Sequence, residues 1–128
     1  MNPAKSALDR NIKFTLHNDA PVVLMGESLG GRNNYIEIME AAINRRTYSG
    51  RVLGENQKIQ PLEALKAVTI NGAWQAREDH IKGSITAGKM ADFVVLSDDP
   101  LNQNTTDFKK IQIMATVKKG KLVYGKFS

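Results

Sequence analysis

An aspartate and a histidine stand directly after one short apolar segment of this 128-residue chain. The segment Lys13-Phe14-Thr15-Leu16 is followed by His17-Asn18-Asp19-Ala20-Pro21. It is rich in strand formers and ends at a turn signal, which predicts a buried strand over residues 12–16. Pro21 blocks simple continuation as a helix or central strand. Ionisable side chains at the end of such a strand lie at the rim of a sheet or barrel, where the active sites of α/β proteins are found.

Two interpretations of these side chains follow from their types. In an extended strand His17 and Asp19 point to one face, because side chains two residues apart share a face. A carboxylate in that place can take a proton from water, but position alone favours the simpler role of capping the next turn. His17 could be a metal ligand, and we expect instead a packing or hydrogen-bonding role.

The elements that must position these residues are helical up to about residue 78. Helical spacing predicts the tail of a helix in residues 1–11, capped by Asn11 in the left-handed region, and a second helix over Tyr35–Arg46. A third helix begins at Pro61, fades near Thr69, and is followed by a shorter helical turn. Trp74, the only tryptophan, is expected to be a packing anchor. The long segment from His17 to about Arg32 is expected to be a functional loop.

After about residue 79 the apolar period changes from 3.6 to 2. The pattern predicts strands over 83–85, 91–97, 111–118 and 121–124, with a hairpin turn at Lys119-Gly120. A closed (β/α)₈ barrel needs about 250 residues and eight strands, and a sandwich needs more strands than these four. Neither unit closes on itself, so we expect a piece of something larger or a chain that completes itself by association.

Composition excludes several classes of protein. The net charge is +5, but the basic residues are spread rather than clustered, which argues against nucleic-acid binding. The chain has no cysteine, which excludes disulfides and thiolate metal sites. No apolar run is long enough to span a bilayer. We therefore expect a soluble protein with no membrane partner, whose compartment the sequence does not indicate.

Several ordered motifs resemble one family, the amidohydrolase superfamily in its amidohydrolase-3 branch. The run Asn18-Asp19-Ala20-Pro21-Val22 is similar to the segment that closes the last barrel strand of that family. Residues 61–65 and 69–73 resemble the helix that follows this strand in the family. The strongest similarity is Gly83-Ser84-Ile85-Thr86-Ala87-Gly88-Lys89-Met90-Ala91-Asp92-Phe93-Val94-Val95-Leu96, a stretch of the family's small β-sandwich. Residues 115–124 resemble its last hairpin.

The resemblance covers about residues 8–126 and implies a metal-dependent parent enzyme. Such an enzyme hydrolyses amide or other C–N bonds of small molecules with water activated by one or two divalent, zinc-like ions. The resemblance makes Asp19 the catalytic residue that orients this water or takes its proton, and a metal ligand in the intact enzyme only. It gives no substrate-binding residues.

The expected fold is α/β plus β, and incomplete on its own. Residues 1–80 would be the last βα portion of a TIM-like (β/α)₈ barrel, and residues 81–128 the C-terminal strands of a small β-sandwich. The other acidic residues of the motifs are expected to have structural roles. Asp92 should accept hydrogen bonds from the backbone of the turn after Lys89, and Asp98-Asp99 should form the turn that ends a strand.

The family's paired histidines, its bridging lysine or glutamate and its later histidines are absent from the chain. His17, His80 and Asp19 cannot build the family's metal centre alone. The leading hypothesis is a C-terminal amidohydrolase fragment that binds no metal and is inactive by itself. The alternative is a non-catalytic regulatory or interaction module, similar to exoenzyme regulators, made of the same parts. Unpaired strand edges predict self-association in either case.

Overall fold

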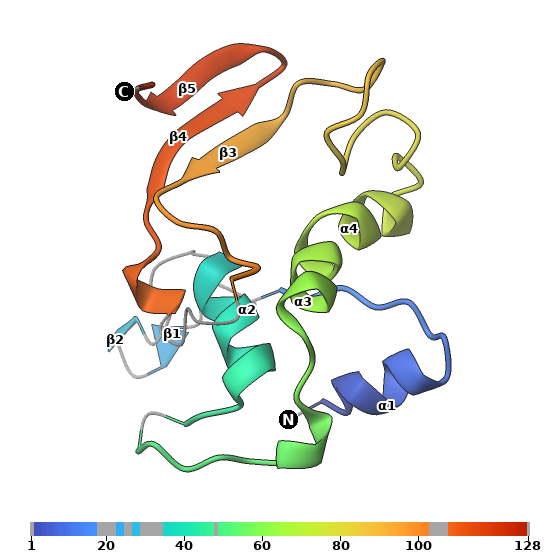
Figure 1. The fold of residues 1–128 in the computed structure, drawn as a ribbon, viewed down its shortest axis with the longest axis vertical. Coiled ribbons are helices and arrows are strands. Elements are labelled where there is room, and N and C mark those ends of the chain that lie inside the picture. The colour runs from blue at the N-terminus through green and yellow to red at the C-terminus, as the bar shows by residue number, and fades with distance from the viewer. Residues whose placement is uncertain are drawn as a thin grey trace.

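The computed structural model describes residues 2–17, 23–24, 27–28, 35–47, 49–102 and 108–127. Asp19, the predicted catalytic residue, and the rest of its motif up to Val22 lie outside these residues. Figure 1 shows the sheet of the C-terminal half at one end of the fold and the N-terminal helix at the other, with the middle helices between them. None of the described helices is long and apolar enough to cross a membrane.

The N-terminal helix α1 (Ala4–Asp9) ends two residues before Asn11, the residue predicted to terminate it in the left-handed conformation. Asn11 has φ of 55°. Its N–H donates to the carbonyl oxygen of Leu8 at 2.9 Å, and the N–H of Ile12 donates to that of Ala7 at 2.9 Å. These two bonds form a Schellman motif, in which an asparagine tolerates the left-handed conformation better than most residues. The predicted cap is therefore confirmed.

The middle helices also begin where the sequence predicts. Helix α2 (Tyr35–Asn44) is two residues shorter than expected, because Arg45 leaves it with φ of 52°. Helix α3 (Pro61–Val68) starts with its proline in the first turn, where no backbone N–H is required. The helix is interrupted at Thr69, and a second helix, α4 (Ile70–Gln75), follows directly. The predicted end of the helix near Thr69 corresponds to this interruption, and the predicted short helical turn corresponds to α4.

The N-terminal segment is fastened to the rest by two polar side chains. Arg45 is buried, and its Nε and Nη1 donate to the carbonyl oxygens of Leu53 at 2.7 Å and Asn2 at 3.2 Å. Gln57, in the 3₁₀ helix η1 (Glu55–Gln57), donates from Nε2 to the hydroxyl of Ser6 at 2.8 Å and accepts its backbone N–H at 3.0 Å. The bonds to Asn2 and Ser6 join residues that are 43 and 51 positions apart in sequence.

The predicted strand over residues 12–16 is wrong as a sheet strand. The segment is extended but pairs with no strand among the described residues. It instead bonds to helices: the N–H of Leu16 donates to the carbonyl oxygen of Ala67 at 3.3 Å, and Nδ2 of Asn71 donates to that of Phe14 at 2.9 Å. Strand-forming residues supply the extended conformation, whereas sheet pairing requires a neighbouring strand that sequence propensity does not provide.

The C-terminal half forms an antiparallel sheet in the order β3 (Phe93–Leu96), β4 (Ile113–Lys118) and β5 (Lys121–Gly125). The turn at Lys119-Gly120 has positive φ at both residues, as a tight hairpin requires. These three strands confirm the period-2 prediction. The expected strand over residues 83–85 is wrong, since this segment is a bend followed by coil. Short strands β1 (Val23–Leu24) and β2 (Glu27–Ser28) pair within the predicted loop.

The buried core draws on both halves of the chain. One cluster joins Ile36 and Met39 of α2 to Phe108 of the 3₁₀ helix η2 (Phe108–Lys110) and to Ile111. The expected boundary near residue 80 stays a prediction. The solvent-accessible surface is 9426 Å², whereas a compact protein of 14.1 kDa exposes about 6,700 Å². The chain therefore buries much less of itself than a self-contained domain of its size.

Gly83 and Gly88 provide a test of the tightest contact between α4 and the segment that follows it. Both have positive φ, 89° and 88°, but a Cβ on Gly83 would lie 2.6 Å from the Cβ of Ala73, whereas nothing lies within 4 Å of one on Gly88. Gly88→Ala should lower the free energy of unfolding by about 1–2 kcal/mol for the backbone alone. Gly83→Ala should lower it by about 2–4 kcal/mol, because overpacking is added. Urea unfolding measures both, and equal losses would contradict the close contact.

Candidate functional site

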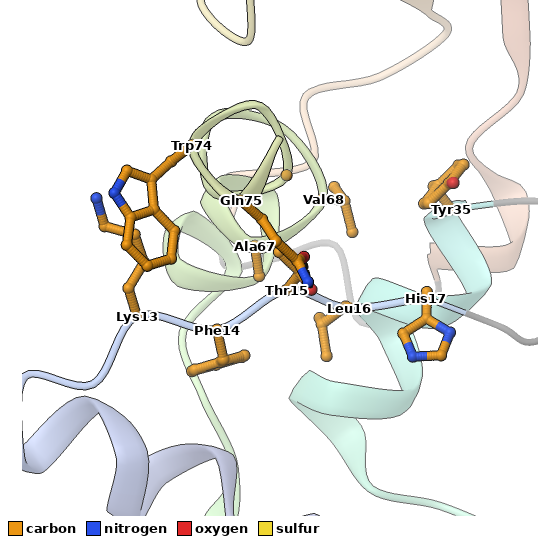
Figure 2. Close-up of a pocket in the computed structure, with 11 residues that line it drawn as sticks. Lys13, Phe14, Thr15, Leu16, His17, Tyr35, Ala67, Val68, Trp74 and Gln75 are labelled. Carbon is orange, nitrogen blue, oxygen red and sulfur yellow. Dashed lines mark hydrogen bonds between the residues drawn. The ribbon is translucent and has the colours of Figure 1, made fainter. Parts of the chain in front are cut away.

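The segment that leads toward Asp19 lines the floor of a groove of about 580 Å³. Figure 2 shows Lys13 and Trp74 at one end of this groove and His17 and Tyr35 at the other. The wall comes from α3 and α4, through residues that include Ala67 and Gln75. The groove therefore follows the extended backbone from residue 13 to residue 17.

A cation–π contact closes one end of the groove. The ammonium of Lys13 lies 4.6 Å from the centroid of the Trp74 ring. Trp74 is 46% exposed, so the prediction that it is a packing anchor is wrong. The physical reason is the face of α4 on which it lies: its neighbour Ala73 is the buried residue, 6% exposed. A single aromatic residue in a helix gives no sign of which face will be covered.

A second polar contact fixes the middle of the groove. The hydroxyl of Thr15 donates to Oε1 of Gln75 at 2.9 Å. Phe14 and Leu16 pack against the buried core, whereas Lys13 and His17 are exposed. The side chains at the two ends of the segment are therefore exposed, and Phe14, Thr15 and Leu16 between them are half-buried. The sequence predicts an extended, buried segment here, but it does not indicate the partners Trp74 and Gln75.

The two histidines form no metal centre in the described part of the chain, and Asp19, the one predicted metal ligand, lies outside it. His17 lies in the groove and His80 is exposed on the segment after α4, as expected for a surface residue. Among the described residues no three histidine, aspartate or glutamate side chains lie close enough to hold a metal ion. Asp19 is not among them. The described residues therefore do not fit a bound metal by themselves.

The motif of strongest resemblance has a structural role in which Lys89 is central. The ammonium of Lys89 donates to the carbonyl oxygen of Asp79, to Oγ of Ser84 at 2.8 Å and to the carbonyl oxygen of Lys82 at 3.5 Å. The N–H of Met90 donates to the carbonyl oxygen of Ile81 at 2.8 Å. Lys89 thereby folds residues 79–90 into a closed loop between α4 and the sheet.

Asp92 bonds to a different turn from the one expected. Its Oδ1 accepts the N–H of Lys119 at 2.6 Å, in the hairpin turn between β4 and β5, rather than backbone in the turn after Lys89. The N–H of Gly120 donates to the carbonyl oxygen of Ala91 at 3.0 Å beside it. Lys119 has φ of 50°, so the carboxylate stabilises a turn that a lysine would otherwise strain.

The remaining acidic side chains act locally. Oδ1 of Asp98 accepts the N–H of Asp99, and Oδ1 of Asp99 accepts that of Leu101, each at 2.8 Å, which confirms the strand-ending turn. On the surface of η1, the pKa of Glu55 lies below its usual value because Lys58 donates a hydrogen bond and adds Coulombic attraction at 2.9 Å. Neither feature contributes to the groove.

Comparison with known proteins gives one family. Residues 1–124 match the model of the amidohydrolase family. The chain is 33% identical over 122 residues to an N-substituted formamide deformylase of Arthrobacter pascens, which covers 95% of this chain and 21% of the relative. It is 27% identical over 124 residues to YtcJ of Bacillus subtilis (strain 168), an amidohydrolase by name, with 95% and 22% covered.

A shorter stretch of the chain is similar to a deaminase. Adenine deaminase 1 of Desulfotalea psychrophila is 37% identical over 65 residues, which is 51% of this chain and 9% of the relative. The chain spans about a fifth of the length of the two relatives that it matches over 95% of its residues.

The structural role of Lys89 can be tested against a surface lysine seven positions away. Lys89→Met should lower the free energy of unfolding by about 1–2 kcal/mol, since three acceptors lose a charged donor. Hydrogen exchange at the amide of Met90 should accelerate in this variant. Lys82→Met is the control, because the ammonium of Lys82 forms only a surface ion pair with Glu78 at 2.5 Å, worth less than about 1 kcal/mol. Equal effects of the two substitutions on Met90 exchange would refute the role of Lys89.

Proposed function

Because this chain belongs to the amidohydrolase family, we propose that it supplies the C-terminal segment of a metal-dependent hydrolase of non-peptide C–N bonds. The observation that carries this proposal is the identity of 33% to a formamide deformylase across 95% of the chain. The deformylase name makes N-substituted formamides the first substrates to test. The whole enzyme's activity is a proposal, since the chain spans only about a fifth of that relative.

The role proposed for this chain's own residues is proton transfer by Asp19. The groove along residues 13–17 runs toward the segment that carries it in sequence. The extended segment that precedes Asp19 in sequence is held in place by hydrogen bonds at Phe14 and Leu16. The divalent metal, when bound in the intact enzyme, would supply activated water. Its ligands would come chiefly from chain segments other than this one, because the chain has only two histidines and no cysteine.

The isolated chain is expected to be inactive. Purified chain with added Zn²⁺ or Mn²⁺ should release no formate from an N-substituted formamide above the rate of the metal alone. Calorimetric titration with Zn²⁺ should show no tight site, since three or more good ligands are needed to hold the ion. Formate release by the pure chain, or stoichiometric tight zinc binding, would contradict the proposed inactivity.

The role of Asp19 is tested in a chimera of the Arthrobacter deformylase, in which this chain replaces the segment that it matches. Asp19→Asn should lower kcat of the chimera by at least about 100-fold with a small change in KM, because general acid–base groups contribute about 10²–10⁴-fold. Asp98→Asn is the matched control, since Asp98 only bonds its own turn. Retained activity in the Asp19 variant would refute its role. A folded chimera without activity would favour the non-catalytic module.

A further inference from the structure

The side chain of Asn71 joins helix α4 to the extended segment 12–16. Its Nδ2 donates to the carbonyl oxygen of Phe14 at 2.9 Å, across 57 positions of sequence, and the residue is half-buried. Asparagine is an unfavourable residue inside a helix, because its side chain competes for nearby backbone groups. Here the amide bonds to the main chain of a distant segment, so the residue connects two elements of the fold.

Helix α4 is a firm base for this bond, because the segment that follows the helix packs tightly against it. A Cβ on Gly83 would lie 2.6 Å from the Cβ of Ala73 and 3.1 Å from the Cα of Ile70. At the end of the helix, the N–H of Glu78 donates to the carbonyl oxygen of Ala73 at 2.8 Å. Side chains on elements that are locked by packing hold a geometry more precisely than side chains on loops. The donor of Asn71 is therefore fixed in place.

The bond from Asn71 sets the direction of the segment that precedes Asp19. The second bond, from the N–H of Leu16 to the carbonyl oxygen of Ala67, is 3.3 Å long, slightly beyond the usual range for N–H···O bonds. Two fixed points two residues apart define a direction, which one point alone does not. Asp19 follows Leu16 by three residues, a reach of at most about 11 Å. A small change of direction at Phe14 would therefore displace Asp19, and a displacement of about 1 Å can cost about 100-fold in rate.

This contact is compatible with further chain on either side of the segment. A carbonyl oxygen has two lone pairs and can accept two hydrogen bonds. Phe14 can therefore accept from Asn71 and from a neighbouring strand at the same time. The argument for Asn71 thus needs no open backbone edge, only the contact between α4 and the segment.

We propose that Asn71 is a positioning residue for the reaction, which holds the segment before Asp19 so that the carboxylate reaches the proton that it takes. This inference rests on the proposed function of Asp19. Asn71 acts through the main chain of Phe14 rather than on a reacting atom. A merely structural tie would change the stability of the fold and leave the chemical step unaltered, and this difference makes the role testable.

The test uses the chimera of the Arthrobacter deformylase that carries this chain. Asn71→Asp keeps the size of the side chain but removes the donor, and should lower kcat about 10- to 100-fold with KM changed less than about threefold. Asn71→Leu removes the donor without adding charge and should give the same loss. Gln57→Glu is the matched control, because it makes the same change of amide to carboxylate at a half-buried residue that bonds Ser6, 51 positions away. It should leave kcat unchanged.

Two further measurements separate positioning from stability. Hydrogen exchange at the amide of Leu16 should accelerate in both Asn71 variants but not in Gln57→Glu, because only the former loosen the segment. In a chimera that already carries Asp19→Asn, Asn71→Leu should lower kcat less than about twofold, because a residue that acts through Asp19 has nothing left to position. The full loss in that background would indicate a structural role and overturn the proposal. Urea unfolding verifies that each variant is folded.

Failure of this inference can be told from failure of the proposed function. If Asp19→Asn inactivates the chimera while both Asn71 variants keep the kcat of the control, Asn71 has no positioning role. If Asn71→Asp loses activity and Asn71→Leu does not, the added charge is the cause and the proposal is equally wrong. A chimera that is inactive from the start, or that stays active with Asp19→Asn, overturns the proposed function and this inference together.

Discussion

Two hydrogen bonds hold the extended segment 12–16 against α3 and α4, and the candidate site depends on them. Asn71 donates to the carbonyl oxygen of Phe14, and Leu16 donates to that of Ala67. They fix the direction in which the chain leaves the core, and therefore the point from which the Asp19 segment starts. The same two bonds hold the segment beside the helices that form the wall of the groove.

This attachment is possible because the helices present small residues to the segment. Ala64 and Ala67 of α3 are 0% and 1% exposed, and the backbone of the segment comes close enough to Ala67 to form a hydrogen bond. The side chain of Ala67 is buried, and its carbonyl oxygen accepts the hydrogen bond from the N–H of Leu16. A larger side chain there would separate the two backbones and lose the bond. The same closeness recurs where Gly83 passes over Ala73.

Local features of the fold could be predicted from the sequence, and pairings could not. Asn11 and Pro61 mark helix ends through their own backbone preferences, and the period-2 pattern after residue 90 identifies the sheet. The strand at 12–16 was predicted from composition, but composition does not say whether a second strand lies beside it. Trp74 was misjudged because its exposure depends on what covers α4. The partners of Lys89 and Asp92 depend on loops brought together only in the fold.

The motif that identifies the family and the residue proposed for its chemistry lie in different parts of the chain, and this has a physical reason. Each of three motif residues meets a specific structural requirement. Gly83 lies where a Cβ would not fit, Lys89 donates to three acceptors, and Asp92 accepts a bond from a strained turn. Such demands tolerate few alternatives, so they leave a strong pattern in sequence. The carboxylate of Asp19, which we propose transfers a proton, lies outside the described residues, and a general base works only where the fold holds it within hydrogen-bond reach of that proton. The recognisable pattern therefore indicates the family through its scaffold, while the proposed chemistry is assigned to a different segment of the chain.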